Sequence, residues 1–263
     1  MFFTGIGTAT PGVTFEHAGV IVFLDGSPVI MEAPAQIIES TTYVPIYCFS
    51  RALGADYITY TAYSAIVAAP GLRIYANDGQ MYIVANGRYL FVPTLCRTID
   101  GKLFVPVRPL AKAFGATVTW YDDGFNMVSV ISTGDPIKPG YRFYNATDLF
   151  WMSRIISAEA RGECKIGRIA VGNVVMNRLH SHMYPNTIYG VIFDRQHGVQ
   201  FTPAHSGAIH RTPARCCVVA AKLALEGANV VGDSLFFSTT TTRCWASRNR
   251  TYVITIGNHN FYA

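Results

Sequence analysis

One carboxylate of this 263-residue chain stands where an apolar side chain is expected. Leu149, Met152 and Ile156 follow the three- and four-residue spacing of one helical face, and Glu159 is the next position on that face. A carboxyl group on a buried stripe loses water, which favours its protonated form and raises its pKa. Such a group holds a proton near neutral pH and can deliver it to a leaving oxygen. We therefore predict that Glu159 is a general acid.

A predicted helix positions this carboxylate in its last turn. Thr147 is the expected N-cap and Gly162 the residue after the helix, which runs to Arg161. Carbonyl groups at the helix C-terminus also disfavour an anion. Arg154 and Arg161 are offset from Glu159 by spacings that do not place them beside it. Glu163 follows the glycine without a burial signal, so we expect it to be solvated or in a structural salt bridge.

Further elements are expected after this helix. Apolar periodicity predicts a helix over 166–180 and another over about 213–225, which Gly227 ends. Strand-like runs follow at 234–237 and 252–256. Helices and strands therefore both contribute to the second half of the chain.

The first half of the chain is an internal repeat. Asp25-Gly26 and Val44-Pro45 recur 61 positions later as Asn86-Gly87 and Val105-Pro106. Such repetition indicates two copies of one supersecondary unit. We predict four regions, which are a tail at 1–17, a two-copy module at 18–131 with copies at about 18–70 and 79–131, a Pro- and Gly-containing linker at 132–146, and a second domain at 147–263.

Charge is distributed unequally between the halves. Residues 1–146 carry 9 Lys and Arg against 10 Asp and Glu, whereas residues 147–263 carry 12 against 6. The second half therefore suits an anionic partner such as nucleic acid or a wall polymer, or simply has a solvated basic surface. No apolar run has the length of a membrane helix, and the N-terminus does not resemble a signal peptide. Six cysteines without a recognisable pattern favour free buried thiols, although disulfides stay open.

The repeat resembles the copper amine oxidase N-terminal-like domain. The second copy carries the resemblance in residues 101–108 (GKLFVPVR) and 113–120 (AFGATVTW). This resemblance implies a non-catalytic spacer or wall-anchoring module. Residues 18–131 contain no histidine, so a histidine-based copper site is not expected there.

The second half resembles the spore-cortex-lytic, SleB-like cell wall hydrolase family. Five blocks occur in family order, at 156–163, 167–178, 185–188, 200–203 and 256–262. The resemblance implies a lysozyme-like fold related to lytic transglycosylases, within an α+β chain. It also implies cleavage of the glycan of peptidoglycan, in spore cortex or vegetative wall, by one catalytic glutamate that falls on Glu159.

The small number of acidic residues in the second half fits a mechanism with a single catalytic acid. The second half has only six, namely Asp148, Glu159, Glu163, Asp194, Glu226 and Asp233. Two-carboxylate glycosidases need a second acid near the first. In a single-acid mechanism the 6-hydroxyl of the substrate attacks and leaves a 1,6-anhydro product.

Five residues are candidates for substrate binding. Asn177, Gln200 and Tyr262 would hydrogen-bond sugar or acetamido groups, and Phe201 and Trp245 would stack on sugar faces. Each of them also has a structural reading, either as a hydrogen-bonding residue of the fold or as a core aromatic.

Other readings of the second half compete with this one. The histidines at 180, 182, 197, 205 and 210 suggest zinc but lack HExxH spacing. Cys164 or Cys216 would be the nucleophile of a cysteine protease. A non-catalytic wall-binding protein with the same fold is the main alternative. We predict an enzyme in the cell wall, spore or extracellular space, which acts on peptidoglycan without metal, cofactor, nucleic-acid partner or transmembrane segment.

Overall fold

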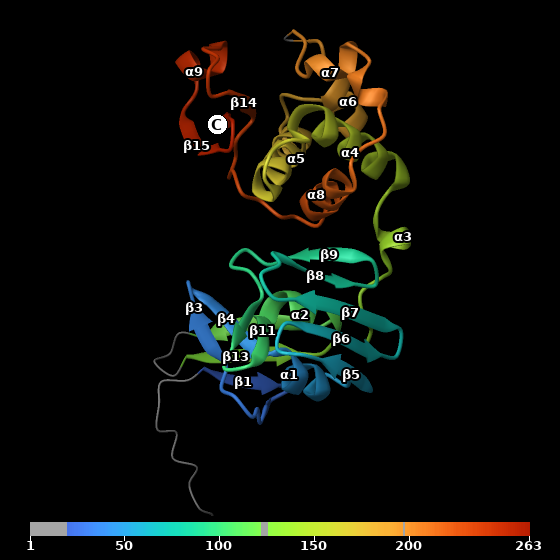
Figure 1. The fold of residues 1–263 in the computed structure, drawn as a ribbon, viewed down its shortest axis with the longest axis vertical. Coiled ribbons are helices and arrows are strands. Elements are labelled where there is room, and N and C mark those ends of the chain that lie inside the picture. Colours follow the sequence, from blue (N-terminus) through green and yellow to red (C-terminus); the bar gives the residue numbers. More distant parts are fainter. Residues whose placement is uncertain (1–19, 122–125, 197) are drawn as a thin grey trace, which may run out of the picture.

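The chain has an α+β fold divided between two parts, as the sequence predicted (Figure 1). The computed structural model describes residues 20–121, 126–196 and 198–263. The predicted tail at 1–17, the turn at 122–124 and His197 lie outside these residues. Strands dominate the part before Ile131, and helices dominate from Gly140 to Leu225.

The elements of the first half repeat with the offset found in the sequence. Ile21 and Tyr82 start equivalent strands 61 positions apart, and Ile46 and Val107 start equivalent helices at the same offset. The first copy comprises β1 (Ile21–Leu24), β2 (Ser27–Pro28), β3 (Gln36–Ile38), β4 (Thr41–Pro45), α1 (Ile46–Ala52), β5 (Tyr57–Tyr60) and β6 (Ser64–Ala69). After β7 (Leu72–Asn77), the second comprises β8 (Tyr82–Ala85), β9 (Arg88–Phe91), β10 (Arg97–Ile99), β11 (Lys102–Pro106), α2 (Val107–Ala113), β12 (Thr117–Tyr121) and β13 (Met127–Ile131).

Two-residue turns with left-handed backbone join the first hairpin of each copy. Asp25 and Gly26 have φ of 49° and 81°, and Asn86 and Gly87 have φ of 49° and 78°. Positive φ at both central residues is the geometry that Asp-Gly and Asn-Gly favour, because it matches the twist of the strands. The backbone of both turns therefore follows from their residue types.

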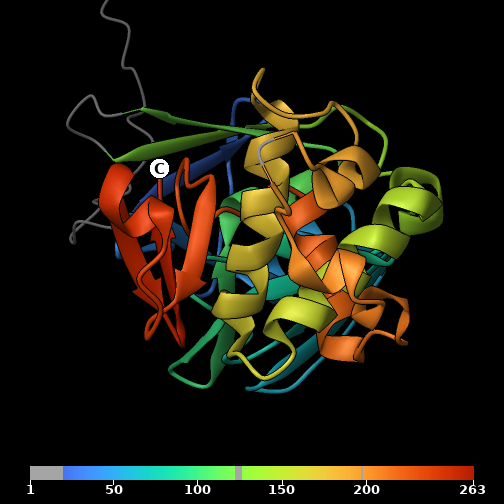
Figure 2. The ribbon, with the colours of Figure 1, turned by 90° about the horizontal axis from the view of Figure 1, so that it is seen from above.

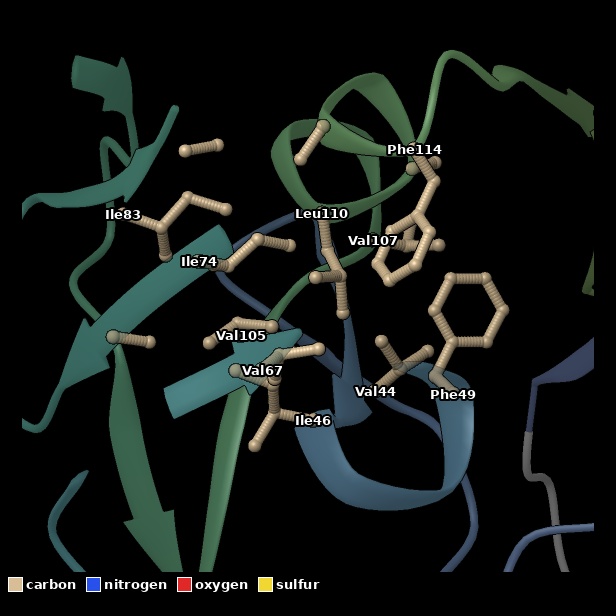
Figure 3. Packing of buried hydrophobic residues seen from close by; sticks show 14 of the residues in the cluster. Val44, Ile46, Phe49, Val67, Ile74, Ile83, Val105, Val107, Leu110 and Phe114 are labelled. Atoms are coloured by element: carbon tan, nitrogen blue, oxygen red, sulfur yellow. The ribbon is translucent and has the colours of Figure 1, made fainter. Parts of the chain in front are cut away.

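The two copies are interleaved. Strand β1 pairs in parallel with β13, with Ile21 opposite Met127, and β4 pairs antiparallel with β11, with Val44 opposite Val105. The sheet orders are β12-β13-β1-β2, β10-β11-β4-β3 and β5-β6-β7-β8-β9. Figure 3 shows side chains of both copies, such as Phe49 and Leu110, directed into one core. Because each copy completes sheets of the other, we expect the module to unfold as one unit.

The segment between the halves is held against the module. Ser132 donates to the Asp25 carboxylate from its backbone N (2.8 Å) and its hydroxyl (2.9 Å). Gly140 N donates to the carbonyl of Asn86 at 2.8 Å and begins the short helix α3 (Gly140–Phe143). A Cβ added to Gly140 would lie 2.8 Å from the carbonyl oxygen of Gly87, so glycine permits this approach.

The second half is a group of helices flanked by a small sheet. Its elements are α4 (Ala146–Ala160), α5 (Lys165–His180), α6 (Ile188–Phe193), α7 (Thr202–His205), η1 (Ala208–His210), α8 (Arg215–Leu225), β14 (Phe236–Thr239), α9 (Trp245–Asn249), β15 (Tyr252–Ile256) and β16 (His259–Tyr262). The sheet order is β14-β16-β15, and this sheet lies beside α5 in both ribbon views (Figure 2).

Helix α4 begins earlier than the sequence suggested. Its N-cap is Asn145, whose side-chain oxygen accepts from the backbone N of Thr147 (2.9 Å) and of Asp148 (3.2 Å). The prediction of Thr147 as the cap was wrong, because an equally good capping residue lies two positions before it. The helix ends at Ala160, one residue before the predicted end.

A buried ion pair joins the two halves. Arg88 of β9 donates to both carboxylate oxygens of Glu226, at 2.6 and 2.7 Å, and the Glu226 side chain is fully buried. Tyr144 Oη donates to the same carboxylate at 3.1 Å, and Lys112 lies 3.3 Å from it. Met81 of the module belongs to the apolar core of the helices. The contact between the halves is thus both polar and apolar. In Figure 1 the halves meet where β9 of the module faces α8.

Two further predictions concern the cysteines and membrane helices. All six cysteines are free, but only Cys96 and Cys217 are buried, while Cys164 and Cys216 are exposed. The expectation of free thiols is confirmed, and the expectation of burial holds for only two of them. No helix of the described residues has both the length and the apolar character needed to cross a membrane.

Candidate active site

Glu159 lies in the last turn of α4, on the side of the helix that packs into the domain. Met152 and Ile156, which precede it on the predicted stripe, are fully buried. Burial raises the pKa of the Glu159 carboxyl from 4.5 to about 7. Glu159 itself is half-buried, so the predicted burial of this position is only partly met, while the predicted direction of the pKa shift is confirmed.

No cation neutralises the Glu159 carboxylate. Among the described residues, its carboxyl forms neither an ion pair nor a hydrogen bond. Arg154, one helical turn away, places its guanidinium 3.9 Å from the centre of the Phe150 ring instead. Without a charge partner, burial alone sets the protonation of Glu159, which leaves a carboxylic acid able to lose and regain a proton near neutral pH.

Glu163 has a structural role. Its carboxylate accepts hydrogen bonds from the backbone N (3.1 Å) and the side-chain Nδ2 (3.0 Å) of Asn258. Partial burial opposes ionisation, but the hydrogen bonds from Asn258 and the charge of His259 outweigh it and lower the pKa of Glu163. A Cβ on Gly257 would collide with Glu163 Oε2. Glu163 thus ties the α4–α5 junction to the β15–β16 turn, as an anion and not as a proton donor.

The other four acidic residues of this half lie in different settings. Asp148 is in the first turn of α4, about 16 Å from Glu159 at ~1.5 Å per residue. Glu226 is held in the ion pair with Arg88. Asp194 is buried and accepts from Gln196 N at 2.9 Å. Asp233 lines a separate cavity of about 370 Å³ with Asn177 and His180.

Three of the five substrate-binding candidates are engaged within the fold. Asn177 donates through Nδ2 to the carbonyls of Gly232 (2.8 Å) and Ser234 (2.9 Å). Phe201 is 1% exposed and packs near Phe237, with 6.1 Å between ring centres. These contacts favour the structural reading of Asn177 and the core reading of Phe201.

Tyr262 is the third engaged candidate. It is 5% exposed and lies between Phe236 and Tyr252 in the three-stranded sheet. Its ring packs edge-on to Tyr252 at 6.2 Å. This burial favours a structural reading of Tyr262 as well.

The other two candidates are more accessible. Trp245 is 57% exposed at the start of α9. Gln200 is half-buried and donates to the carbonyl of Gly198 at 3.2 Å. Their settings leave both as candidates for substrate contact.

The histidines do not form a visible metal site. His205 Nδ1 lies 2.7 Å from an Arg195 guanidinium nitrogen, and His180 lines the cavity with Asp233. Across 20–121, 126–196 and 198–263, no three His, Cys, Asp or Glu side chains are grouped as metal ligands. Asn258 and Arg88 were not anticipated from the sequence, because their partners are far along the chain and no local pattern marks them.

Two family models match the chain. The model described as Cell Wall Hydrolase matches residues 162–262, and the model described as Copper amine oxidase N-terminal domain matches residues 23–129. The first match begins three residues after Glu159 and includes Glu163. The two matches fall on the two halves described above.

Curated relatives cover the second half. Spore cortex-lytic enzymes of Bacillus cereus and Halalkalibacterium halodurans are each 33% identical over 120 residues, and that of Bacillus subtilis is 30% identical. The aligned region covers 45% of this chain and 45%, 35% and 38% of the respective relatives. The chain therefore spans less than half the length of the curated relatives it matches.

Solved structures resemble the same region. The catalytic domain of the germination-specific lytic transglycosylase SleB from Bacillus anthracis is 30% identical, with a TM-score of 0.42, and the match covers 48% of this chain and all of that domain. The SleB catalytic domain from Bacillus cereus is 31% identical with the same TM-score, and 92% of it is covered.

These findings identify the class of protein, which has a strand-rich module before a helical domain of the cell wall hydrolase type. The chain belongs to the cell wall hydrolase family through its second half and carries a copper amine oxidase N-terminal-like module in its first.

Proposed function

We propose that the chain cleaves the glycan strands of peptidoglycan and that Glu159 serves as both acid and base. The observation that carries this proposal is the half-buried Glu159 carboxyl, which has no charge partner among the described residues and has a pKa raised to about 7. Membership of the cell wall hydrolase family supports the substrate class. The names of the relatives support action on the spore cortex during germination and a location at the spore or cell wall.

The reaction begins with proton transfer from Glu159 to the glycosidic oxygen. The bond between this oxygen and the anomeric carbon breaks, and the departing sugar leaves with a new hydroxyl group. In a lytic transglycosylase, the 6-hydroxyl of the remaining sugar attacks the anomeric carbon and gives its proton to the Glu159 carboxylate. The products are a 1,6-anhydro end and a free hydroxyl end, and Glu159 is protonated again. A hydrolase would use water in place of the 6-hydroxyl.

The setting of the remaining acids supports one carboxylate in both roles. Glu163 and Glu226 are held as hydrogen-bonded anions, by Asn258 and by Arg88 respectively. Retaining glycosidases place two carboxyl groups about 5 Å apart, and inverting ones about 6.5–9.5 Å apart. Asp148 lies farther from Glu159 than either spacing, at roughly three helical turns.

Substrate contacts are assigned to the accessible candidates. We assign Trp245 to stacking on a sugar face and Gln200 to a hydrogen bond with a sugar or acetamido group. The first half serves as a spacer or wall-anchoring module, and the buried pair of Arg88 and Glu226 fixes its position relative to the hydrolase half.

Product analysis tests the reaction type. Purified cortex and vegetative peptidoglycan are digested with the full chain, and the fragments are examined by mass spectrometry. New 1,6-anhydro ends indicate a lytic transglycosylase, and new reducing ends indicate a hydrolase. New peptide termini with intact glycan strands would overturn the proposal. Wall binding without fragments would support the non-catalytic alternative.

A further inference from the structure

The C-terminal lobe, defined as residues 234–263, is a cationic surface without acidic residues. It contains Arg243, Arg248 and Arg250 but no Asp, Glu or Lys. All three arginines are exposed. In the part of the chain that the structure describes, none of them forms an ion pair or a side-chain hydrogen bond, and the ion pairs found there use Arg88, Arg97 and Lys112. No ion pair or side-chain hydrogen bond of the described residues therefore depends on the arginines of the lobe.

Aromatic rings hold one of these arginines in place. The Arg250 guanidinium carbon lies 5.0 Å from the centre of the Phe236 ring and 5.1 Å from that of Trp245. These two ring centres are 5.8 Å apart. A guanidinium that stacks on rings keeps its N–H groups directed outward at its edge, where a carboxylate can accept two hydrogen bonds. Phe236 and Trp245 thus pre-orient Arg250 for a planar anion.

Exposed aromatic surface continues beside this arginine. Trp245 is 57% exposed, and Tyr252 on the edge strand β15 is 56% exposed. Phe236, Tyr262 and Tyr252 are cross-strand neighbours, so their side chains share one face of the sheet. Arg248 lies three residues after Trp245 on α9 and therefore on the same side of that helix. Arg248, Arg250, Trp245 and Tyr252 form what we call the arginine–aromatic face.

We propose that the arginine–aromatic face binds peptidoglycan strands through the carboxylates of their lactyl and peptide groups. Stacked rings suit sugar faces, and outward guanidinium groups suit carboxylates. This charge complementarity selects an anionic polysaccharide over a neutral one. The inference rests on the proposed function for its choice of polymer.

The face lies at the end of β15 opposite the β15–β16 turn. Glu163 fixes that turn at Asn258, next to the end of α4. Tyr252 is six positions from Asn258, which is on the order of 20 Å at ~3.3 Å per residue along β15. We therefore assign the face to binding of the strand and not to proton transfer.

Wall-binding measurements with single-charge variants test this inference. The full chain with Glu159→Gln, which keeps the wall intact, is sedimented with insoluble peptidoglycan, with and without Arg250→Gln. Arg211→Gln is the matched control, because Arg211 is exposed, lies in the second half outside the arginine–aromatic face, and forms no ion pair in the described regions. The same proteins are tested on wall whose carboxyl groups have been converted to amides, and with duplex DNA.

We expect Arg250→Gln to weaken binding to native wall about tenfold and Arg211→Gln to change it less than twofold. On amidated wall, Arg250→Gln and its parent should bind equally. The inference would be overturned if both variants lost wall affinity equally, or if Arg250→Gln lost the same affinity for amidated wall as for native wall. A loss confined to DNA would assign the face to nucleic acid instead. If the wild-type protein fails to cleave wall but wall binding still depends on Arg250, the proposed function is wrong and this inference stands.

Discussion

Glu159 and Glu163 lie four positions apart at the end of α4, and their carboxyl groups have opposite surroundings. Glu159 is half-buried and has no partner in the described part of the chain, and its pKa is raised to about 7. Glu163 accepts two hydrogen bonds from Asn258, which lower its pKa although its partial burial acts in the opposite direction. One carboxyl can therefore donate a proton near neutral pH, while the other is a stable anion that holds the β15–β16 turn.

We expect Glu159→Gln to stabilise the fold at pH 8 by roughly 3 kcal/mol. In the wild type, the folded carboxyl stays protonated up to about pH 7, whereas the unfolded one ionises near 4.5. Wild-type stability therefore falls as the pH rises from about 4.5 to about 7, and the glutamine variant lacks this loss. Urea denaturation of both proteins at pH 4, 6 and 8 measures the difference. The difference in free energy of unfolding should vanish at pH 4. A difference that does not change with pH would contradict the desolvation assigned to the Glu159 carboxyl.

The rate of wall cleavage should depend on the same ionisation. The acid must carry its proton, so kcat/KM should fall as the pH rises above about 7, approaching tenfold per pH unit. Release of soluble fragments between pH 5 and 9, at low substrate concentration, gives this profile. A rate that keeps increasing up to pH 9 would exclude Glu159 as the proton donor.

Gly257→Ala should destabilise the protein more than Gly232→Ala. Both glycines have left-handed backbone, with φ of 57° and 55°, so each substitution costs about 1–2 kcal/mol from conformation. A Cβ at position 257 also collides with Glu163 Oε2, whereas a Cβ at position 232 has nothing within 4 Å. Thermal unfolding of the two variants separates these effects. Equal melting temperatures would mean that the contact between Glu163 and the turn is not tight.

Arg88→Met should destabilise the chain by about 3 kcal/mol, because it leaves the buried Glu226 carboxylate without its main partner. Arg97→Met is the control. Its pair with Glu39 has side chains that are 37% and 61% exposed, so the loss should be at most about 1 kcal/mol. Denaturant unfolding of both variants provides the comparison. Similar losses would show that the two halves do not depend on this pair.

Local patterns in the sequence predicted part of this account. The stripe of Met152, Ile156 and Glu159 predicted a carboxyl on the packed side of α4, because helical periodicity places these positions on one face, and Glu159 is half-buried there. The backbone of the Asn86-Gly87 turn follows from its own residue types in the same local way. Thr147 was a wrong choice of cap because several adjacent residues cap equally well.

Contacts between distant parts of the chain were not predictable. The pairing of Ile21 with Met127 interleaves the repeats, and no local pattern records which copy completes which sheet. Arg88 and Glu226 are 138 positions apart in the sequence, although their side chains are hydrogen-bonded to each other. The sequence also could not show whether Phe201 stacks on a sugar or packs in the core, because the residue type is the same in both cases. In the structure Phe201 is a core residue.

Cleavage of purified peptidoglycan by Glu159→Gln, compared with Glu163→Gln and the wild type, tests the central claim most directly. Release of new glycan ends is measured at pH 6, where all three proteins are first shown to be folded. We expect Glu159→Gln to lose at least about a hundredfold in rate, the usual scale of general acid catalysis, and Glu163→Gln to keep most of the activity. Wild-type rates in Glu159→Gln, or loss of activity only in Glu163→Gln, would contradict the assignment of Glu159 as the catalytic acid.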